Sequence, residues 1–278
     1  MALLTGFSIP TYFPQSWDHT YVLSDEGFVW ACFGRSAGGH EICSDDGDSA
    51  VADCLSQPNG RAGIVYLVTG VCHQAANRIL WPAKLLVDHA GGYGWSTAWF
   101  GRYGTDPWPE LDQCANIQLA GGAVTSQRGS GPVSANKHPS RLFQKIWDAY
   151  RRLIASWSSL GSAEEQAVAA ARSELEALAS EKLGENYHRG KIETVARIQA
   201  EYRLRQRRLA GDLSAGRVSQ EQYLNTFSAL LAEAGARYEA ILGREDFLKL
   251  FGVTPENAPR LSESERNIFL SDRVVSSH

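Results

Sequence analysis

The strongest constraint on the fold is a change of sequence pattern near the middle of the chain. Residues 1–115 contain short β-type runs separated by Gly and Pro, a pattern typical of strands joined by tight turns. From about residue 139, apolar residues recur at spacings of three and four, which indicates helices. We therefore predict the α+β class, with an α+β domain over residues 1–120, a Gly/Ser-rich linker or loop over 121–138, and an α-helical domain over 139–278 that forms a bundle or a long helical hairpin.

Three β-type runs and one helix are expected in the first half. Residues 19–23 and 28–33 form a predicted hairpin, and a third strand is predicted over 62–68. From Cys72 onward the apolar residues fall on one face of a helix, which Pro82 limits.

The second half carries explicit helix-start signals. Capping boxes of the form Ser-x-x-Glu/Gln begin at Ser162, Ser219 and Ser262. Apolar stripes at helical spacing run over residues 142–157 and 223–242. These signals predict several helices with caps of their own.

The charge balance limits the classes of partner. A formal net charge of -4 argues against broad binding to nucleic acid or anionic membranes, because both need a positive field. No apolar run approaches the ~20 residues needed to span a bilayer, and the first residues lack the pattern of a secretory signal. We expect a cytoplasmic protein, with secretion by a route without a cleaved signal left open.

The five cysteines all lie before residue 115, are odd in number and contain no CxxC pair. A chain of this size does not need disulfides to hold a core. Reduced thiols are therefore the expectation, and thiol chemistry belongs to the first half.

Cys72 is the residue that most strongly suggests chemistry. A cysteine in the first turn of a helix faces unpaired backbone N–H groups and the positive end of the helix dipole, which favour its thiolate. The same N–H groups can bind an oxyanion. We expect Cys72 to be a nucleophile, with Val71, His73 and Gln74 as oxyanion-binding or supporting residues.

A thiol nucleophile also needs a base, and His19 at the start of a predicted strand is the first choice. His40, just before a short β-type run, is the choice for the group that orients the imidazole. Cys32 is kept as an alternative nucleophile, because a tight hairpin would place it across from His19.

The order of these motifs resembles a known family. A His on an early strand (Asp18-His19-Thr20), followed by further strands and a Cys that opens a helix (Val71-Cys72), is similar to the circularly permuted papain-like group of the NlpC/P60 superfamily, which includes lecithin-retinol-acyltransferase-like hydrolases. The resemblance covers residues 10 to 100. It implies a small antiparallel sheet packed on the Cys helix and amide or ester bonds as substrates. Many such proteins carry Asn before the Cys, where this chain has Val71.

A Gly-aromatic stretch follows the Cys helix. It holds Trp95, Trp99, Tyr103 and Trp108. Two interpretations stay open, a substrate-binding wall or lid and a packing seam under a long loop.

The sequence thus favours a thiol hydrolase or acyl transferase that needs no cofactor and acts on a protein, peptide or other acyl-bearing substrate. The helical half would cap the cleft, recognise the substrate or form an oligomer. A second hypothesis is a non-catalytic scaffold whose helices bind a protein partner, and a third is a metal site that includes His40 and Cys43. A solvent-reachable Cys72–His19 pair favours the enzyme, whereas a Cys72 sulfur enclosed by apolar packing favours the scaffold.

Overall fold

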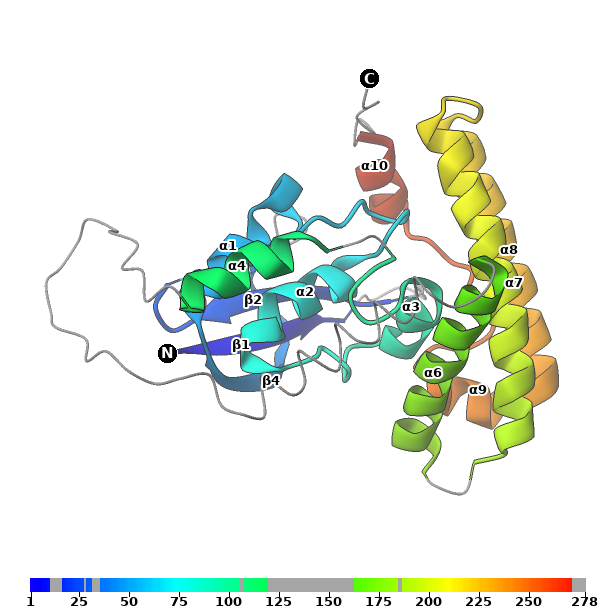
Figure 1. The fold of residues 1–278 in the computed structure, drawn as a ribbon. Helices are drawn as coiled ribbons and strands as arrows, with labels where there is room; N and C mark the ends of the chain where they lie inside the picture. Colours follow the sequence, from blue (N-terminus) through cyan, green and yellow to red (C-terminus); the bar gives the residue numbers. More distant parts are fainter. Residues whose placement is uncertain are drawn as a thin grey trace, which may run out of the picture.

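A computed structural model gives the arrangement of most of the chain. It describes residues 1–10, 17–27, 29–31, 36–105, 108–119, 163–184 and 187–271. A four-stranded antiparallel sheet with helices is followed by a mostly helical second half, so the predicted α+β class is confirmed (Figure 1).

The sheet has the strand order β3-β2-β1-β4. Its strands are β1 (Ala2–Ile9), β2 (His19–Ser24), β3 (Val29–Ala31) and β4 (His40–Gly47). The predicted hairpin is β2 and β3, whereas the central strand β1 was not predicted. Since β1 pairs with both β2 and β4, it fixes the position of every other strand.

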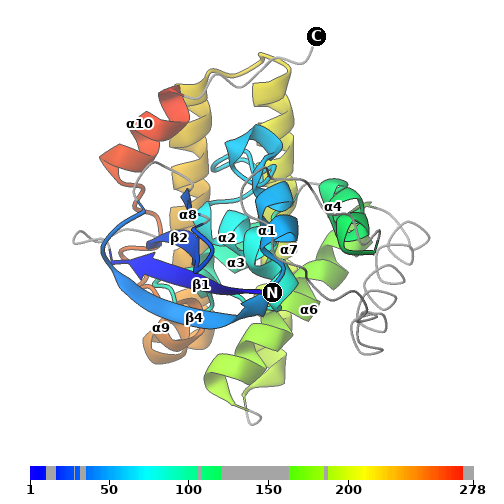
Figure 2. The same cartoon turned by 90° about the vertical axis from the view of Figure 1, so that its left-hand side faces the viewer.

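One face of the sheet packs against helix α2 (Cys72–Leu80), which lies behind the sheet in Figure 2. Leu4 and Val22 on this face are fully buried. Gly6 lets the helix approach closely, because a Cβ there would lie 2.7 Å from the Cys43 sulfur and 3.1 Å from Leu80 Cδ1. The small antiparallel sheet packed on the Cys helix is therefore present.

The third strand predicted over 62–68 is wrong. Ala62 and Leu67 have φ values of 52° and 59°, which a β-strand does not allow. The segment instead forms turns with a single parallel bridge between Tyr66 and Gly70. Ile64 and Leu67 are nonetheless fully buried, so the apolar run correctly indicated burial but not conformation.

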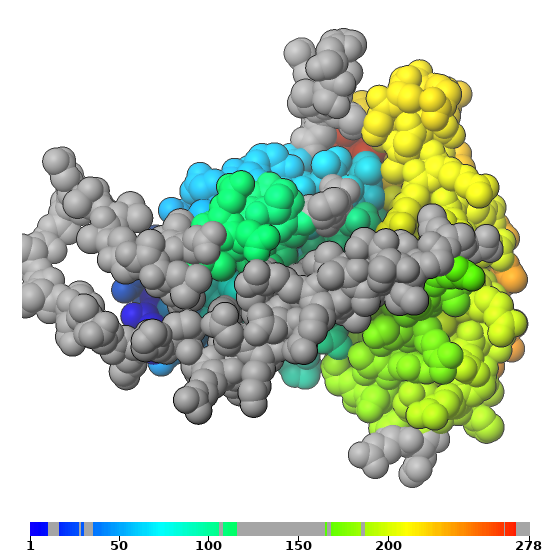
Figure 3. Space-filling model, in the orientation of Figure 1, coloured from blue at the N-terminus to red at the C-terminus, as the bar shows by residue number. Residues whose placement is uncertain are grey.

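Three further helices belong to the first half, together with 3-10 turns at Pro58–Gly60 and Trp81–Ala83. The helices are α1 (Ser49–Ser56), α3 (Tyr93–Phe100) and α4 (Glu110–Leu119). A disulfide joins Cys54 of α1 to Cys114 of α4. The expectation of reduced thiols is wrong for this pair, because packing of α4 on α1 brings two distant cysteines together. In the space-filling view α4 lies on the surface (Figure 3).

The second half consists of long helices followed by two short ones. They are α6 (Ala163–Leu183), α7 (Arg189–Ser214), α8 (Gln220–Leu242), α9 (Arg244–Phe251) and α10 (Glu263–Ser271). The capping boxes at Ser219 and Ser262 are confirmed by their hydrogen bonds. The predicted linker over 121–138, the stripe over 142–157 and the capping Ser162 lie outside the described residues.

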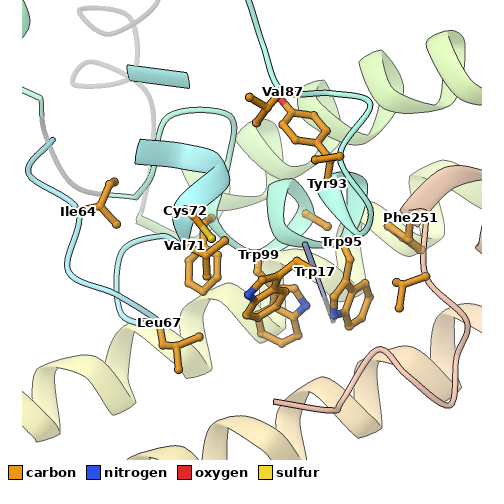
Figure 4. Close-up of a cluster of buried hydrophobic side chains, with 14 of the residues drawn as sticks. Trp17, Ile64, Leu67, Val71, Cys72, Val87, Tyr93, Trp95, Trp99 and Phe251 are labelled. Carbon is orange, nitrogen blue, oxygen red and sulfur yellow. The ribbon is translucent and has the colours of Figure 1, made fainter. Parts of the chain in front are cut away.

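The two halves share one hydrophobic core. The Trp95 ring of α3 contacts Phe251 of α9 and Tyr238 of α8, with ring centroids 5.3 and 6.0 Å apart. Its indole N–H donates to the carbonyl of Ala258 at 2.9 Å. Thus the helical half completes the core of the first half (Figure 4). Within the described ranges, no helix is long and apolar enough to cross a membrane.

Candidate functional site

Helix α2 begins at Cys72, as the sequence predicted. Val71 precedes it in an extended conformation, with φ -131° and ψ -170°. The loop before the helix is closed by Thr69, whose hydroxyl accepts the Val65 N–H at 2.9 Å. Cys72 therefore occupies the first turn of a well-defined helix, beside strand β2 and in the middle of the core (Figure 4).

The Cys72 thiol is enclosed, with only 2% of the residue exposed. Its sulfur donates to the Asp18 carbonyl at 3.7 Å. Burial raises the pKa of the thiol to about 12; the Thr20 N–H and hydroxyl oppose the increase, and the Glu265 carboxylate adds to it. The lowered pKa expected from the helix start is therefore absent, because loss of water outweighs the favourable dipole.

The position of His19 follows from the sheet register. His19 is opposite Ile9 on β1, and Thr20 is opposite Ser8. Because neighbouring side chains on a strand point to opposite faces, His19 shares the face of Ile9 and Thr20 shares the face that contacts Cys72. The structure brings the backbone around His19 to Cys72, and although the register places the His19 side chain on the other face of the strand, its charge still acts on the buried His73 imidazole. The role of His19 as the base stays a prediction.

His40 lies at the exposed start of strand β4. Strand β1 separates β4 from β2, so the two histidines come from strands that do not pair with each other. Its proposed role in orienting the imidazole stays a prediction. Cys32, the alternative nucleophile, lies outside the described residues.

His73 is fully buried beside Cys72. Its Nδ1 lies 2.8 Å from the Ser96 hydroxyl, and burial lowers the pKa of the imidazole to about 4. The ring is therefore neutral at pH 7. His73 links the start of α2 to α3, and its role in supporting an oxyanion site stays a prediction.

Gln74 supports the helix start directly. Its Oε1 accepts the Val71 N–H at 3.0 Å, and its Nε2 donates to the Gly101 carbonyl at 2.9 Å. The Val71 N–H is thus already hydrogen-bonded and does not serve an oxyanion in this arrangement. Any oxyanion donors would have to come from the following N–H groups of the helix.

Buried polar atoms without a hydrogen-bond partner gather around Cys72. Among the described residues they include Trp17 Nε1, Thr20 Oγ1 and His73 Nε2. None makes a hydrogen bond of full geometry, although each has a polar neighbour: Glu265 for the Trp17 N–H, the Cys72 sulfur for the Thr20 hydroxyl and the Asp18 backbone for the His73 imidazole. Native proteins keep few such atoms, and a local group of them indicates a place where a ligand, water or substrate completes the bonding.

Glu265 of α10 is a member of this region that sequence analysis missed. It is 6% exposed, and its Oε1 accepts the Tyr66 hydroxyl at 3.4 Å. Burial raises the pKa of the carboxyl to about 7, although hydrogen bonds from Ser262 oppose the increase. The capping box identified Glu265 as a helix-start residue, but no sequence pattern connects it with Cys72.

The four aromatic residues expected at a substrate wall fall into two groups, two in the core and two in half-buried positions. Trp95 and Trp99 are enclosed in the core, 0% and 1% exposed, so the packing seam describes them and the substrate wall does not. Tyr103 and Trp108 are half-buried and stack on each other at 5.5 Å. The Arg78 guanidinium lies 5.2 Å from the Trp108 ring. A substrate contact by Tyr103 and Trp108 stays a prediction.

The described ranges contain no group of three His, Cys, Asp or Glu side chains that could hold a metal ion. Comparisons of the chain with protein-family models, with curated proteins and with solved structures found no match.

Proposed function

We propose that this protein is a cysteine hydrolase or acyl transferase acting on an amide or ester bond, with Cys72 as the nucleophile. The observation that carries the proposal is the group of unpaired buried polar atoms around a thiol at the start of a helix. These atoms make no hydrogen bond of full geometry in the described arrangement, so their bonding capacity is available to a carbonyl group that enters beside the sulfur. The resemblance to the permuted papain-like group supports the same assignment.

The chemistry requires an ionised thiol. Because burial raises the pKa of Cys72 to about 12, the thiol is protonated at pH 7 in the described arrangement. The described arrangement is therefore a resting form, and the active form must admit water to the sulfur, which restores the influence of the helix start on its pKa.

In the active form, the Cys72 thiolate attacks the carbonyl carbon, and the tetrahedral oxyanion is held by N–H groups of the first turn of α2. The bond to the leaving amine or alcohol breaks as His19 returns the thiol proton to it. Water or an acceptor alcohol or amine then attacks the thioester and releases the acyl group. This sequence requires the His19 imidazole to turn toward Cys72 at the first residue of β2.

Alkylation of Cys72 by iodoacetamide across pH tests the need for His19. We compare wild type with His19→Ala and use His188→Ala as the control, because His188 is an exposed histidine at the start of α7 with no proposed role at the site. An activated thiol reacts well below the pH of an ordinary thiol, and His19→Ala should remove that excess by about tenfold or more. Identical pH profiles for Cys72 in wild type and His19→Ala would refute the role of His19.

The enclosure of Cys72 itself favours a second function, a non-catalytic scaffold. A sulfur that is 2% exposed with a pKa near 12 is what core packing produces. In a scaffold, Cys72→Ala lowers stability without removing any activity. Partner binding would then reside in the long helices α7 and α8.

A further inference from the structure

We propose that helix α10 is a plug that closes the Cys72 site and is released when the site opens. The regulatory role of the plug rests on the proposed thiol chemistry, but closure of the Cys72 site can be measured without a substrate. The plug is defined as residues Glu263–Ser271.

Glu265 is the residue of the plug that reaches the site. It is buried against Tyr66, whose hydroxyl donates to it, and its charge acts on the Cys72 sulfur. The Trp17 N–H, which has no full hydrogen bond, also favours the Glu265 carboxylate. The Glu265 carboxyl thus lies against the Tyr66 and Trp17 donors and near enough to Cys72 for its charge to act on the sulfur, so we expect the plug and a substrate to compete for this place.

The plug is held by a small number of contacts on α8. Phe269 stacks on Tyr223 with ring centroids 5.3 Å apart, and its carbonyl accepts from Gln220 at 2.9 Å. Arg266 donates to Asn225 at 3.3 Å on the exposed side. α10 lies beside α8 at the margin of the molecule, and Phe269 anchors it in the shared core (Figures 1 and 2), so release of the plug requires this ring to leave its place against Tyr223.

Closure should weaken as the pH rises. The groups that face Glu265 are Tyr66, Trp17, Ser262 and Cys72, and none carries a positive charge. The pKa of Glu265 is about 7 when the plug is closed and near its ordinary value of 4.5 when it is released. A raised carboxyl pKa means that closure binds a proton, so the closed form is favoured fully below pH 4.5 and loses this advantage as pH rises through 7.

The test is iodoacetamide labelling of the full chain, read by mass spectrometry on the peptide that contains Cys72. Phe269→Ala removes the ring that holds the plug, and Leu270→Ala is the matched control on the same helix, since Leu270 is 41% exposed. We expect Phe269→Ala to label Cys72 about tenfold faster or more, and Leu270→Ala to label it as wild type does. Equal rates in both variants would overturn the proposal.

The half-buried Cys43 serves as an internal reference within the same molecule. Release of the plug accelerates labelling of Cys72 alone, whereas general unfolding of Phe269→Ala accelerates both cysteines. In the latter case Glu265→Gln is the variant that tests the proposal, because it keeps the shape of the side chain and removes its charge.

For Glu265→Gln, the informative quantity is the labelling rate of Cys72 in wild type divided by the rate in the variant. This ratio should rise about 100-fold between pH 5 and pH 9, because ionisation of the buried Glu265 destabilises the closed form of wild type, whereas the side chain in the variant carries no charge at any pH. A ratio that stays constant with pH would overturn the proposal. If Cys72 is labelled rapidly after release of the plug but never forms an acyl adduct, the plug proposal is supported and the thiol hydrolase proposal is rejected.

Discussion

At the scale of single residues, helix α2 buries an unusual set of polar side chains. His73, Gln74, Asn77 and Arg78 are each at most 1% exposed. Most of their partners are backbone groups of neighbouring loops: the carbonyls of Ala62, Gly101, Arg102 and Tyr103 and the N–H of Val87. Because a buried polar group is costly unless hydrogen-bonded, these bonds fix the loops on the helix and make α2 a rigid base for Cys72.

Gln74→Ala tests this support. The change removes the acceptor of the Val71 N–H and the donor to the Gly101 carbonyl, so it should lower the free energy of unfolding by about 2–4 kcal/mol. Gln222→Ala is the matched control, because Gln222 has the same capping role on an exposed turn of α8 and should cost only about 1 kcal/mol. Urea titration measures both, and equal losses would contradict the account.

At the scale of elements, sequence patterns predicted the pieces whose burial follows a regular period. The capping boxes at Ser219 and Ser262 correctly marked α8 and α10, and the helix at Cys72 began where the period changed. Strand β1 was not predicted because its burial does not alternate: Leu4 and Thr5 are both buried, so the period of two that marks a half-buried strand is absent. The run over 62–68 was misassigned because an apolar composition is compatible with a buried turn.

The disulfide between α1 and α4 gives a prediction at this scale. It closes a loop of 60 residues, and in the chain-entropy model such a loop contributes about 4 kcal/mol to stability. Reduction of the wild type, or Cys54→Ser with Cys114→Ser, should lower the free energy of unfolding by roughly that amount. Cys43→Ser is the control for loss of a thiol without a crosslink. Insensitivity of the urea midpoint to reductant would show that the bond is absent in solution.

At the scale of the whole molecule, the candidate site lies where the two halves meet. The sequence suggested His19 and Cys72 as a pair, but the face of β2 that meets α2 depends on pairing with β1, a strand that was not predicted. The contact of Glu265 with this region depends on how the last helices fold back, and no local pattern encodes it. Local periodicity therefore predicted the elements, whereas the composition of the site required the tertiary arrangement.

The central claim is that Cys72 is a nucleophile kept in a closed form. The most direct measurement is intact-protein mass spectrometry after brief incubation of Phe269→Ala with p-nitrophenyl acetate. The account predicts one acetyl adduct, located on Cys72, that forms faster than in wild type and is absent from the Phe269→Ala, Cys72→Ala double variant. An adduct that persists in the double variant, or no adduct on a Cys72 that iodoacetamide alkylates readily, would contradict it.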